Sequence, residues 1–307
     1  MDELALRLDS LPGEPLVIPY ARIEGTAGAG PHLTVVAGVH GGEYTGMAAI
    51  MRLIQGLDAS TLSGTITAVP ILNQPAFWSR TAFVVPADGK NLNRCFPGDP
   101  AGSYTDVLAH EIFTRLIAPS DYLLDLHAGD LPEALAPFCL YEESDVEDRS
   151  RRLALAYGLE HVVRQTRATR TVGGSTSSAA ADAGIPAIIA EIGANGICDQ
   201  VSVDRHLRGV LAVCTEVGML PGGSAATQVR PVEYEGWIWM RSPVRGFWQS
   251  RVAVGQDVAQ GDVLGVLLDP LGRELEQIVA PAPGCPLFLT TSPATAADGL
   301  LLGLATR

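Results

Sequence analysis

Short apolar runs alternate with amphipathic segments along the first two thirds of the chain. Each run ends at a polar or turn residue, as a buried strand does. The segments between the runs place apolar residues three and four positions apart, for example at 108, 112, 113 and 116, which predicts helices that bury one face. This alternation predicts an α/β fold with a mixed, mainly parallel sheet flanked by helices. Expected strands cover 16–23, 33–39, 64–71, 122–126, 138–141, 161–165 and 187–190, and expected helices cover 45–57, 105–117, 146–157, 177–183 and 204–217.

The pattern changes in the Gly- and Pro-rich segment 220–226, beyond which helical periodicity disappears. Short apolar runs punctuated by Gly and Pro then predict a C-terminal all-β sandwich or barrel. We therefore expect two domains, residues 1–227 and residues 228–307. The second resembles the β-sandwich of lipoyl and biotinyl carriers in its glycine- and valine-rich turns. The only lysine of the chain, Lys90, lies in the first domain, so we expect a lid or an oligomerisation element and not a carrier.

Composition favours a large apolar core and argues against two classes of partner. Hydrophobic residues make up 47% of the 307 residues and charged residues 18%, as in a buried α/β sheet. The formal net charge of −13 repels nucleic acid and anionic membranes, and no apolar run is long enough for a transmembrane helix. Five cysteines without a Cys-x-x-Cys pair predict reduced thiols and a cytoplasmic location. The expected partners are a small-molecule substrate and, in a possible homo-oligomer, other copies of the chain.

The sequence His40-Gly41-Gly42-Glu43 follows the apolar run 33–39. If a helix begins near Glu43, the two glycines let the backbone turn sharply, and both polar side chains face one point. An imidazole and a carboxylate placed in this way can bind a divalent metal. A glycine turn followed by a helix with Glu in its first turn is also ordinary structural chemistry. The motif alone leaves both interpretations open.

Two further apolar runs end in residues that can complete a metal site. Asp125-Leu126-His127 ends one run and Glu191 ends another. Open parallel sheets bind ligands at the carboxyl ends of their strands, so we expect His40, Glu43, His127 and Glu191 at one edge. The first three form the ligand set of a catalytic zinc, one ion per chain, that keeps its fourth position for water. Asp125 lies on the same side of its strand as His127, where it either orients this ligand or caps nearby backbone.

The loop 88–98 gathers Lys90, Asn93 and Arg94 in a chain that is otherwise acidic. Arginine offers a planar fork that binds a carboxylate through two hydrogen bonds, so the loop predicts a site for an anionic substrate. The alternative is that Arg94 pairs with a surface carboxylate while the asparagines form turns. Other histidines have no acid at ligand spacing, and we expect surface or capping roles for His32, His110, His161 and His206.

Four motifs in this order resemble the succinylglutamate desuccinylase and aspartoacylase family of the zinc carboxypeptidase-like superfamily. They are His-Gly-Gly-Glu, Asn-Leu-Asn-Arg followed by Phe-Pro-Gly, Asp-Leu-His and Glu-Ile-Gly. The resemblance spans residues 16–220 and implies a zinc-dependent hydrolase that cleaves the amide bond of a small N-acyl amino acid or acylated diamino acid. It implies a general base, Glu191, and a clamp for the substrate carboxylate, Asn93 with Arg94. The implied zinc ligands are His40, Glu43 and His127.

One position departs from the family's pattern. The family places a further arginine a few residues before the Asn-Arg pair to stabilise the oxyanion, whereas residues 84–87 are Val-Val-Pro-Ala here. Arg80 is the nearest candidate, and we assign the oxyanion role to it. A carboxypeptidase-like peptidase and a non-catalytic metal-binding relative are the alternative functions. The Gly-x-Ser-x-Gly elbow of many serine hydrolases is absent from the sequence.

Overall fold

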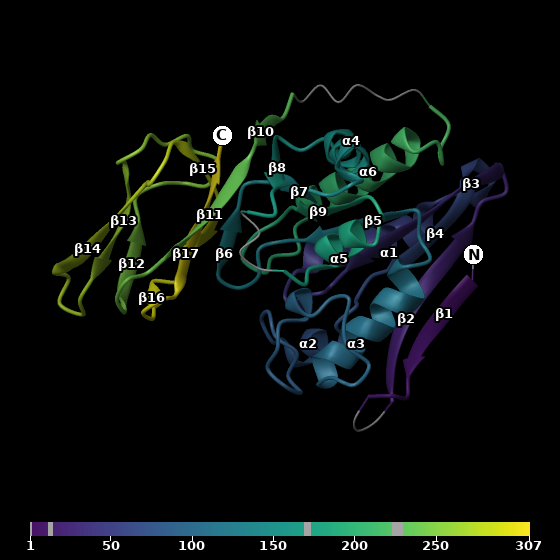
Figure 1. Cartoon of the computed structure of the whole chain (residues 1–307), viewed down its shortest axis with the longest axis horizontal. Helices are drawn as coiled ribbons and strands as arrows, with labels where there is room; N and C mark the ends of the chain where they lie inside the picture. The colour runs from purple at the N-terminus through teal and green to yellow at the C-terminus, as the bar shows by residue number, and fades with distance from the viewer. Residues whose placement is uncertain (1, 12–14, 169–172, 223–229) are drawn as a thin grey trace.

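The computed structural model describes residues 2–11, 15–168, 173–222 and 230–307, and its largest unit is a nine-stranded mixed sheet (Figure 1). The strand order is β1-β2-β4-β3-β5-β9-β7-β8-β10. The four central strands β4, β3, β5 and β9 are parallel to one another, which confirms the predicted fold class. The strands are β1 (Asp2–Leu8), β2 (Leu16–Glu24), β3 (Gly28–Ala37), β4 (Ser63–Val69), β5 (Tyr122–His127), β7 (Phe138–Glu142), β8 (His161–Gln165), β9 (Ala187–Glu191) and β10 (Val232–Tyr234).

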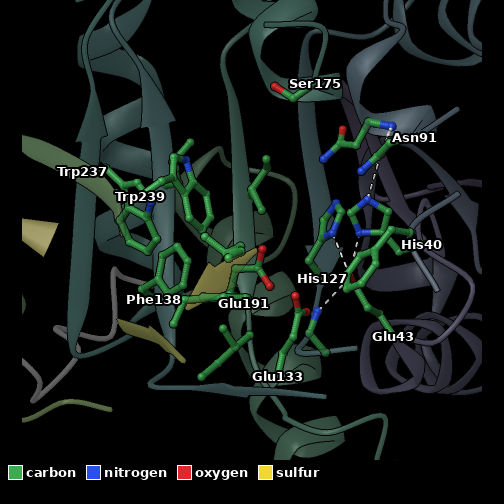
Figure 2. Close-up of a pocket in the computed structure, with 18 of the residues that line it drawn as sticks. His40, Glu43, Asn91, His127, Glu133, Phe138, Ser175, Glu191, Trp237 and Trp239 are labelled. Atoms are coloured by element: carbon green, nitrogen blue, oxygen red, sulfur yellow. Dashed lines mark hydrogen bonds and ion pairs between the residues drawn. The ribbon is translucent and has the colours of Figure 1, made fainter. Parts of the chain in front are cut away.

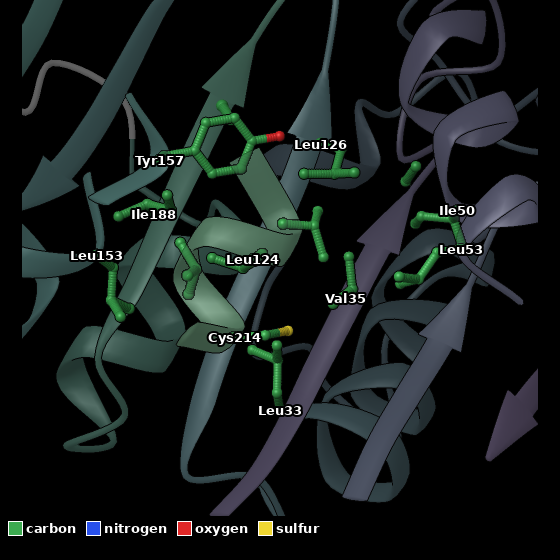
Figure 3. Close-up of a cluster of buried hydrophobic side chains, with 14 of the residues drawn as sticks. Leu33, Val35, Ile50, Leu53, Leu124, Leu126, Leu153, Tyr157, Ile188 and Cys214 are labelled. Atoms are coloured by element: carbon green, nitrogen blue, oxygen red, sulfur yellow. The ribbon is translucent and has the colours of Figure 1, made fainter. Parts of the chain in front are cut away.

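Helices cover both faces of this sheet because successive strand side chains point to opposite sides. Leu33 and Val35 of β3 pack into one apolar cluster, which Figure 3 shows, and Val36 packs into another on the opposite face. Fully burying one such side chain stabilises the fold by roughly 1.5–3 kcal/mol, so both clusters hold the strand ends in place. The first cluster includes residues of α1 (Tyr44–Gly56), α4 (Glu147–Tyr157) and α6 (Gln200–Glu216), and the second includes residues of α3 (Tyr104–Ile112), its π-helical continuation η3 (Phe113–Ile117) and α5 (Thr176–Asp182).

The C-terminal region forms two four-stranded antiparallel sheets that pack face to face. Leu264 and Ile278 of one sheet pack with Leu302 and Leu304 of the other, as in a β-sandwich. The predicted all-β architecture is therefore confirmed. The first sheet has the order β11-β17-β15-β6, with β11 (Gly236–Arg241), β17 (Leu300–Thr306), β15 (Gly284–Thr290) and β6 (Glu133–Leu135), and the second has the order β14-β13-β12-β16, with β14 (Glu274–Val279), β13 (Val263–Leu268), β12 (Gly246–Ser250) and β16 (Ala294–Thr295).

Two strands connect the predicted domains. β6 comes from the first and pairs with β15, with Glu133 opposite Thr290. β10 comes from the second and pairs with β8 at the edge of the large sheet. The boundary at 227/228 and residues 223–226 of the predicted linker lie outside the described residues, so the division into two domains stays a prediction.

The structure contains several short elements that were not predicted from the sequence. Elements of two to seven residues are too short to establish a hydrophobic period. The elements that were not expected are β1, β6, β10, β15, β16, β17, α2 (Gln74–Ser79), η1 (Ala59–Thr61) and η2 (Leu92–Arg94).

Within the described ranges, no helix is both long and apolar enough to cross a lipid bilayer.

Candidate metal centre and active site

His40, Glu43 and His127 meet at the carboxyl ends of β3 and β5. Glu43 Oε1 lies 2.6 Å from His40 Nδ1, and Glu43 Oε2 lies 2.8 Å from His127 Nδ1. The three side chains offer ligand atoms within 4.8 Å of one another and are buried (Figure 2). Gly42 lets the Asp130 side chain approach the turn between His40 and Glu43, because a Cβ there would lie 2.0 Å from Asp130 Oδ1. A glycine is therefore required at this position of the turn for a steric reason.

The outer nitrogen of each imidazole is held by an acceptor. His127 Nε2 donates to Asp125 Oδ2 at 2.9 Å, since a carboxylate oxygen can only accept. His40 Nε2 donates to Asn91 Oδ1 at 3.1 Å, and the same oxygen accepts the Asn93 amide at 2.8 Å. A neutral imidazole that donates from Nε2 turns its Nδ1 lone pair towards a Glu43 oxygen. Two lone pairs repel at these short distances, so the cluster needs a positive charge, either a proton or a cation, and two imidazoles with one carboxylate fit a divalent metal such as zinc.

The electrostatics of the cluster agree with this need for a cation. Burial raises the pKa of Glu43, but His40 and His127 lower it further, to about 2. Burial lowers the pKa of His127, but Asp125 and Glu43 raise it well above its ordinary value. The group therefore attracts a proton to the position where a metal would compete with it. Metal binding at such a site releases protons and strengthens as the pH rises.

Glu191 ends β9 directly beside His127, the residue opposite it in the β5–β9 register. It lines the same cavity as the three candidate ligands. Burial, together with the charges of Glu43 and Asp125, raises the pKa of Glu191 to about 8. A carboxylate with a raised pKa in a cavity can take and return a proton near neutral pH. A cation at the neighbouring cluster would lower this pKa.

The predicted substrate loop reaches the cavity with two of its three candidates. Asn93 is buried, and its Oδ1 accepts the Thr176 amide at 3.1 Å. Arg94 is exposed, lines the cavity, and donates to the Asn93 carbonyl at 2.7 Å. Arg94 has no carboxylate partner among the residues that the structure describes, so its guanidinium is available to an anion. Lys90 instead pairs with Asp106 at 2.6 Å, and it is not among the described residues that line the cavity.

Arg80 also stays away from the cavity lining. It is the exposed residue that ends α2, and its backbone is left-handed with φ 55°. In the described part of the chain, neither Arg80 nor Lys90 is brought to the candidate ligands. The oxyanion role of Arg80 and the substrate-binding role of Lys90 stay predictions. No contact among the described residues supports either of them.

Sequence reasoning missed several residues of the site. Asn91, which holds His40, lies inside the predicted loop but was assigned no role. His206, for which a surface or capping role was expected, is fully buried, and its Nε2 lies 3.2 Å from the carbonyl oxygens of His127 and Ile192. Burial lowers the pKa of His206 to about 4, so it is a neutral donor that fixes the backbone of a candidate metal ligand. A histidine six positions into a helix gives no local signal of such a role.

Glu133 is a further unpredicted acid of the cavity. It is buried, and Asp130 donates its amide to Glu133 Oε2 at 3.0 Å. Burial, followed by the charge of Glu43, raises the pKa of Glu133 to about 9 from an ordinary 4.5. Between these pH values the folded protein holds a proton that the unfolded chain has released, so this residue makes the fold less stable as the pH rises.

Replacing Glu133 by glutamine is therefore expected to stabilise the metal-free protein at pH 8 by on the order of 2 kcal/mol, and by much less at pH 5. Thermal unfolding of wild type and variant at both pH values measures this difference. Glu276→Gln, at an exposed position of β14, is the matched control and should change little at either pH. An equal shift at pH 5 and pH 8 for Glu133→Gln would contradict the titration argument.

The cavity has a volume of about 510 Å³ and contains the three candidate ligands, Glu191, Asn93 and Arg94. A mixed sheet with helices on both faces, which carries a His-Glu-His group and a nearby acid at the ends of its parallel strands, defines an α/β protein with a candidate metal centre. Residues 29–217 match the sequence model of the succinylglutamate desuccinylase/aspartoacylase catalytic domain. This match covers more than half of the chain, which therefore belongs to the succinylglutamate desuccinylase/aspartoacylase family.

Known proteins resemble the chain over most of its length. The N-alpha-acetyl-L-2,4-diaminobutyric acid deacetylase of Halomonas elongata is 31% identical over 252 residues, which are 79% of this chain and 72% of the relative. The product-bound ectoine utilization protein EutE (DoeB) of Ruegeria pomeroyi has a TM-score of 0.84 at 23% identity and covers 99% of this chain and 94% of its own. The succinylglutamate desuccinylase/aspartoacylase of Rhodobacter sphaeroides has a TM-score of 0.83 at 23% identity and covers 98% of this chain and 95% of its own. At these identities the two structures establish the fold.

Proposed function

We propose that the protein is a zinc-dependent hydrolase that cleaves the amide bond of a small N-acyl amino acid or acylated diamino acid. The observation that carries this proposal is the meeting of His40, Glu43 and His127 with Glu191 in one cavity. The activity named for the Halomonas elongata relative supports an acylated diamino acid as the substrate. One zinc ion per chain is the proposed cofactor. The cytoplasmic location and a homo-oligomeric state stay predictions.

The proposed mechanism assigns a role to each side chain of the cavity. Bound zinc supplies a Lewis acid that acidifies water and polarises the scissile carbonyl. Glu191 accepts a proton from the attacking water and later donates it to the leaving amine nitrogen. Asn93 and Arg94 bind the substrate carboxylate and so hold the amide in place. Asp125 and Asn91 keep both imidazoles turned with Nδ1 towards the ligand position.

The test of this function is chelator-sensitive release of a free amine. Purified protein is incubated with N-acetyl, N-succinyl and N-formyl amino acids, including Nα-acetyl-L-2,4-diaminobutyrate, and amine release is measured with and without a chelator. Turnover of at least one N-acyl amino acid that stops on chelation supports the proposal. Cleavage of dipeptides in preference to these compounds would favour the peptidase alternative. Turnover of neither class by zinc-loaded protein would favour a non-catalytic relative.

Replacing Arg94 by alanine is expected to raise the KM for a carboxylate-bearing substrate by about 10- to 100-fold, because the variant loses a charge-assisted, two-point contact. Zinc content should stay near one ion per chain, since Arg94 touches none of the candidate ligands. Steady-state kinetics and metal analysis measure the two effects. Arg208→Ala, at an exposed position of α6, is the matched control. An unchanged KM in the Arg94 variant would contradict the clamp.

A further inference from the structure

One face of the sheet β11-β17-β15-β6 forms an apolar wall of the cavity. Side chains two positions apart in a strand share a face, and Trp237 and Trp239 of β11 both line the cavity. Phe288 of β15, Leu300 of β17 and Leu135 of β6 complete this surface, which we name the aromatic wall. The ring centroids of Trp237 and Trp239 lie 5.1 Å apart, and those of Trp239 and Phe288 lie 5.6 Å apart.

The large sheet supplies the opposite side of the same apolar space. Phe138 and Leu140 of β7 and Ile189 of β9 line the cavity there. Phe138 contacts the aromatic wall directly, with its ring centroid 5.4 Å from that of Trp237. Trp239 is only half-buried, so part of its ring faces the cavity. An apolar surface that faces a cavity from two sides favours an apolar ligand group, because binding removes that surface from water.

The aromatic wall and the candidate metal ligands lie at opposite ends of the cavity. Figure 2 shows His40, His127 and Asn91 on one side, Glu191 between, and Trp237 with Trp239 on the other. Arg94 donates to the Asn93 carbonyl, and the Asn93 amide donates to the Asn91 oxygen that also contacts His40, so these contacts attach Arg94 to the metal side. A substrate whose carboxylate binds Arg94 and whose amide lies beside Glu191 has its acyl group on the far side of the amide, towards the aromatic wall.

We propose that the aromatic wall binds the acyl group of the substrate, and that this acyl group is apolar and larger than acetyl. This inference rests on the proposed hydrolase function and adds the substrate class. It also assigns a role to the C-terminal β-sandwich, which supplies four of the five residues of the aromatic wall. Specificity for the acyl group then depends on strands far in sequence from the catalytic motifs.

A cationic group is the competing ligand chemistry, because Glu133 and Glu191 line the same cavity. A cation bound by an aromatic ring needs an open ring face. Trp237 does not offer one, since it is only 6% exposed. Its ring packs against Phe138 and against the backbone of Gly303, where a Cβ would lie 2.1 Å from the indole. Trp239 does expose part of its ring, but it packs against Phe288, and the wall is completed by two leucines. These apolar neighbours favour an apolar acyl chain.

Three acyl derivatives of one amine separate these possibilities. Nα-acetyl-, Nα-heptanoyl- and Nα-(6-aminohexanoyl)-L-2,4-diaminobutyrate are compared by kcat/KM with zinc-loaded wild type. The heptanoyl and 6-aminohexanoyl chains have equal length and differ at their ends, where one has a methyl group and the other an ammonium group. We expect heptanoyl to exceed acetyl by at least about 50-fold, because each of its five additional methylenes contributes roughly fourfold when buried. We also expect heptanoyl to exceed 6-aminohexanoyl by at least about tenfold, because the ammonium must leave water.

Replacing Trp239 by alanine is expected to reduce the ratio of heptanoyl to acetyl kcat/KM to below about tenfold, through the loss of apolar contact area. Trp78→Ala, at a position of α2 that is 74% exposed and outside the cavity lining, should leave the ratio unchanged. Calorimetric binding of the same three compounds to zinc-loaded Glu191→Gln protein provides a readout that needs no turnover.

The outcomes separate this inference from the proposed function. Equal or better use of acetyl, or preference for 6-aminohexanoyl, overturns the apolar acyl site while leaving the hydrolase in place. Tighter binding of the heptanoyl compound, lost in a Trp239→Ala background, supports the acyl site even if no compound is hydrolysed. Failure of the heptanoyl compound to bind more tightly than the acetyl compound overturns it.

Discussion

Replacing Glu191 by glutamine is expected to lower kcat by about 10²- to 10⁴-fold, the usual contribution of a general acid-base residue. Glutamine keeps the shape of the side chain but cannot accept the proton of the attacking water. Metal content should stay near one ion per chain, because Glu191 is not one of the three candidate ligands. Steady-state kinetics with metal analysis of the same samples measures both quantities.

The pH dependence provides a second measurement of the same role. Only the ionised carboxylate can act as a base, so kcat/KM of the wild type should fall as the pH falls through the pKa of Glu191. This pKa is about 8 without a cation, and a bound metal lowers it, so kcat/KM of the wild type should begin to fall at a pH below 8. The residual kcat/KM of Glu191→Gln should not show this fall at acidic pH. Glu276→Gln is the matched control, and near-normal kcat in the Glu191 variant would exclude Glu191 from the mechanism.

Removal of the metal is expected to lower turnover by more than about 10³-fold, because the water and the scissile carbonyl both lose their Lewis acid. Dialysis against a chelator followed by one equivalent of zinc should abolish and then restore activity. The melting temperature should fall with the metal, since a ligand present at 100 times its Kd stabilises the folded state by about 2.7 kcal/mol. Activity and thermal unfolding of the same preparations measure the two effects.

Loss of one ligand should resemble loss of the metal. His127→Ala removes one of two imidazoles that face Glu43 and leaves Asp125, a fully buried carboxylate, without its imidazole partner. We expect metal content well below one ion per chain and no restoration by added zinc. His110→Ala, at a half-buried position of α3 outside the cavity lining, is the control for histidine removal. Full activity in the presence of an excess of chelator would contradict the metal-dependent mechanism.

The candidate metal group was predictable because its signals are local. His40 with Glu43, and His127, each follow an apolar run, and in a parallel sheet such run ends meet at one edge. The same reasoning placed Glu191 beside them. The fold class was predictable for a related reason, since the alternation of periods 2 and 3.6 depends on residues close in sequence.

For the loop 88–98, the sequence predicted the kind of site but not the partner of each side chain. Its composition indicated an anion site, and Arg94 does line the cavity without an ion-pair partner among the described residues. Composition could not indicate that Lys90 would turn to Asp106 on the following helix, or that Asn91 would hold His40. Those choices depend on the direction in which each backbone position points, which the packing of the loop against distant elements determines.

By itself, the sequence determined the α/β and all-β architectures, the residues of the candidate metal group and the acid beside them. It could do so because hydrophobic periodicity and short motifs depend only on residues that are close in sequence. Only the tertiary structure decided that β6 joins the C-terminal sheet, and that Trp237 and Trp239 stand across a cavity from His40. The physical reason is that strand pairing between distant segments follows from the burial of whole faces. No short window of residues contains that information.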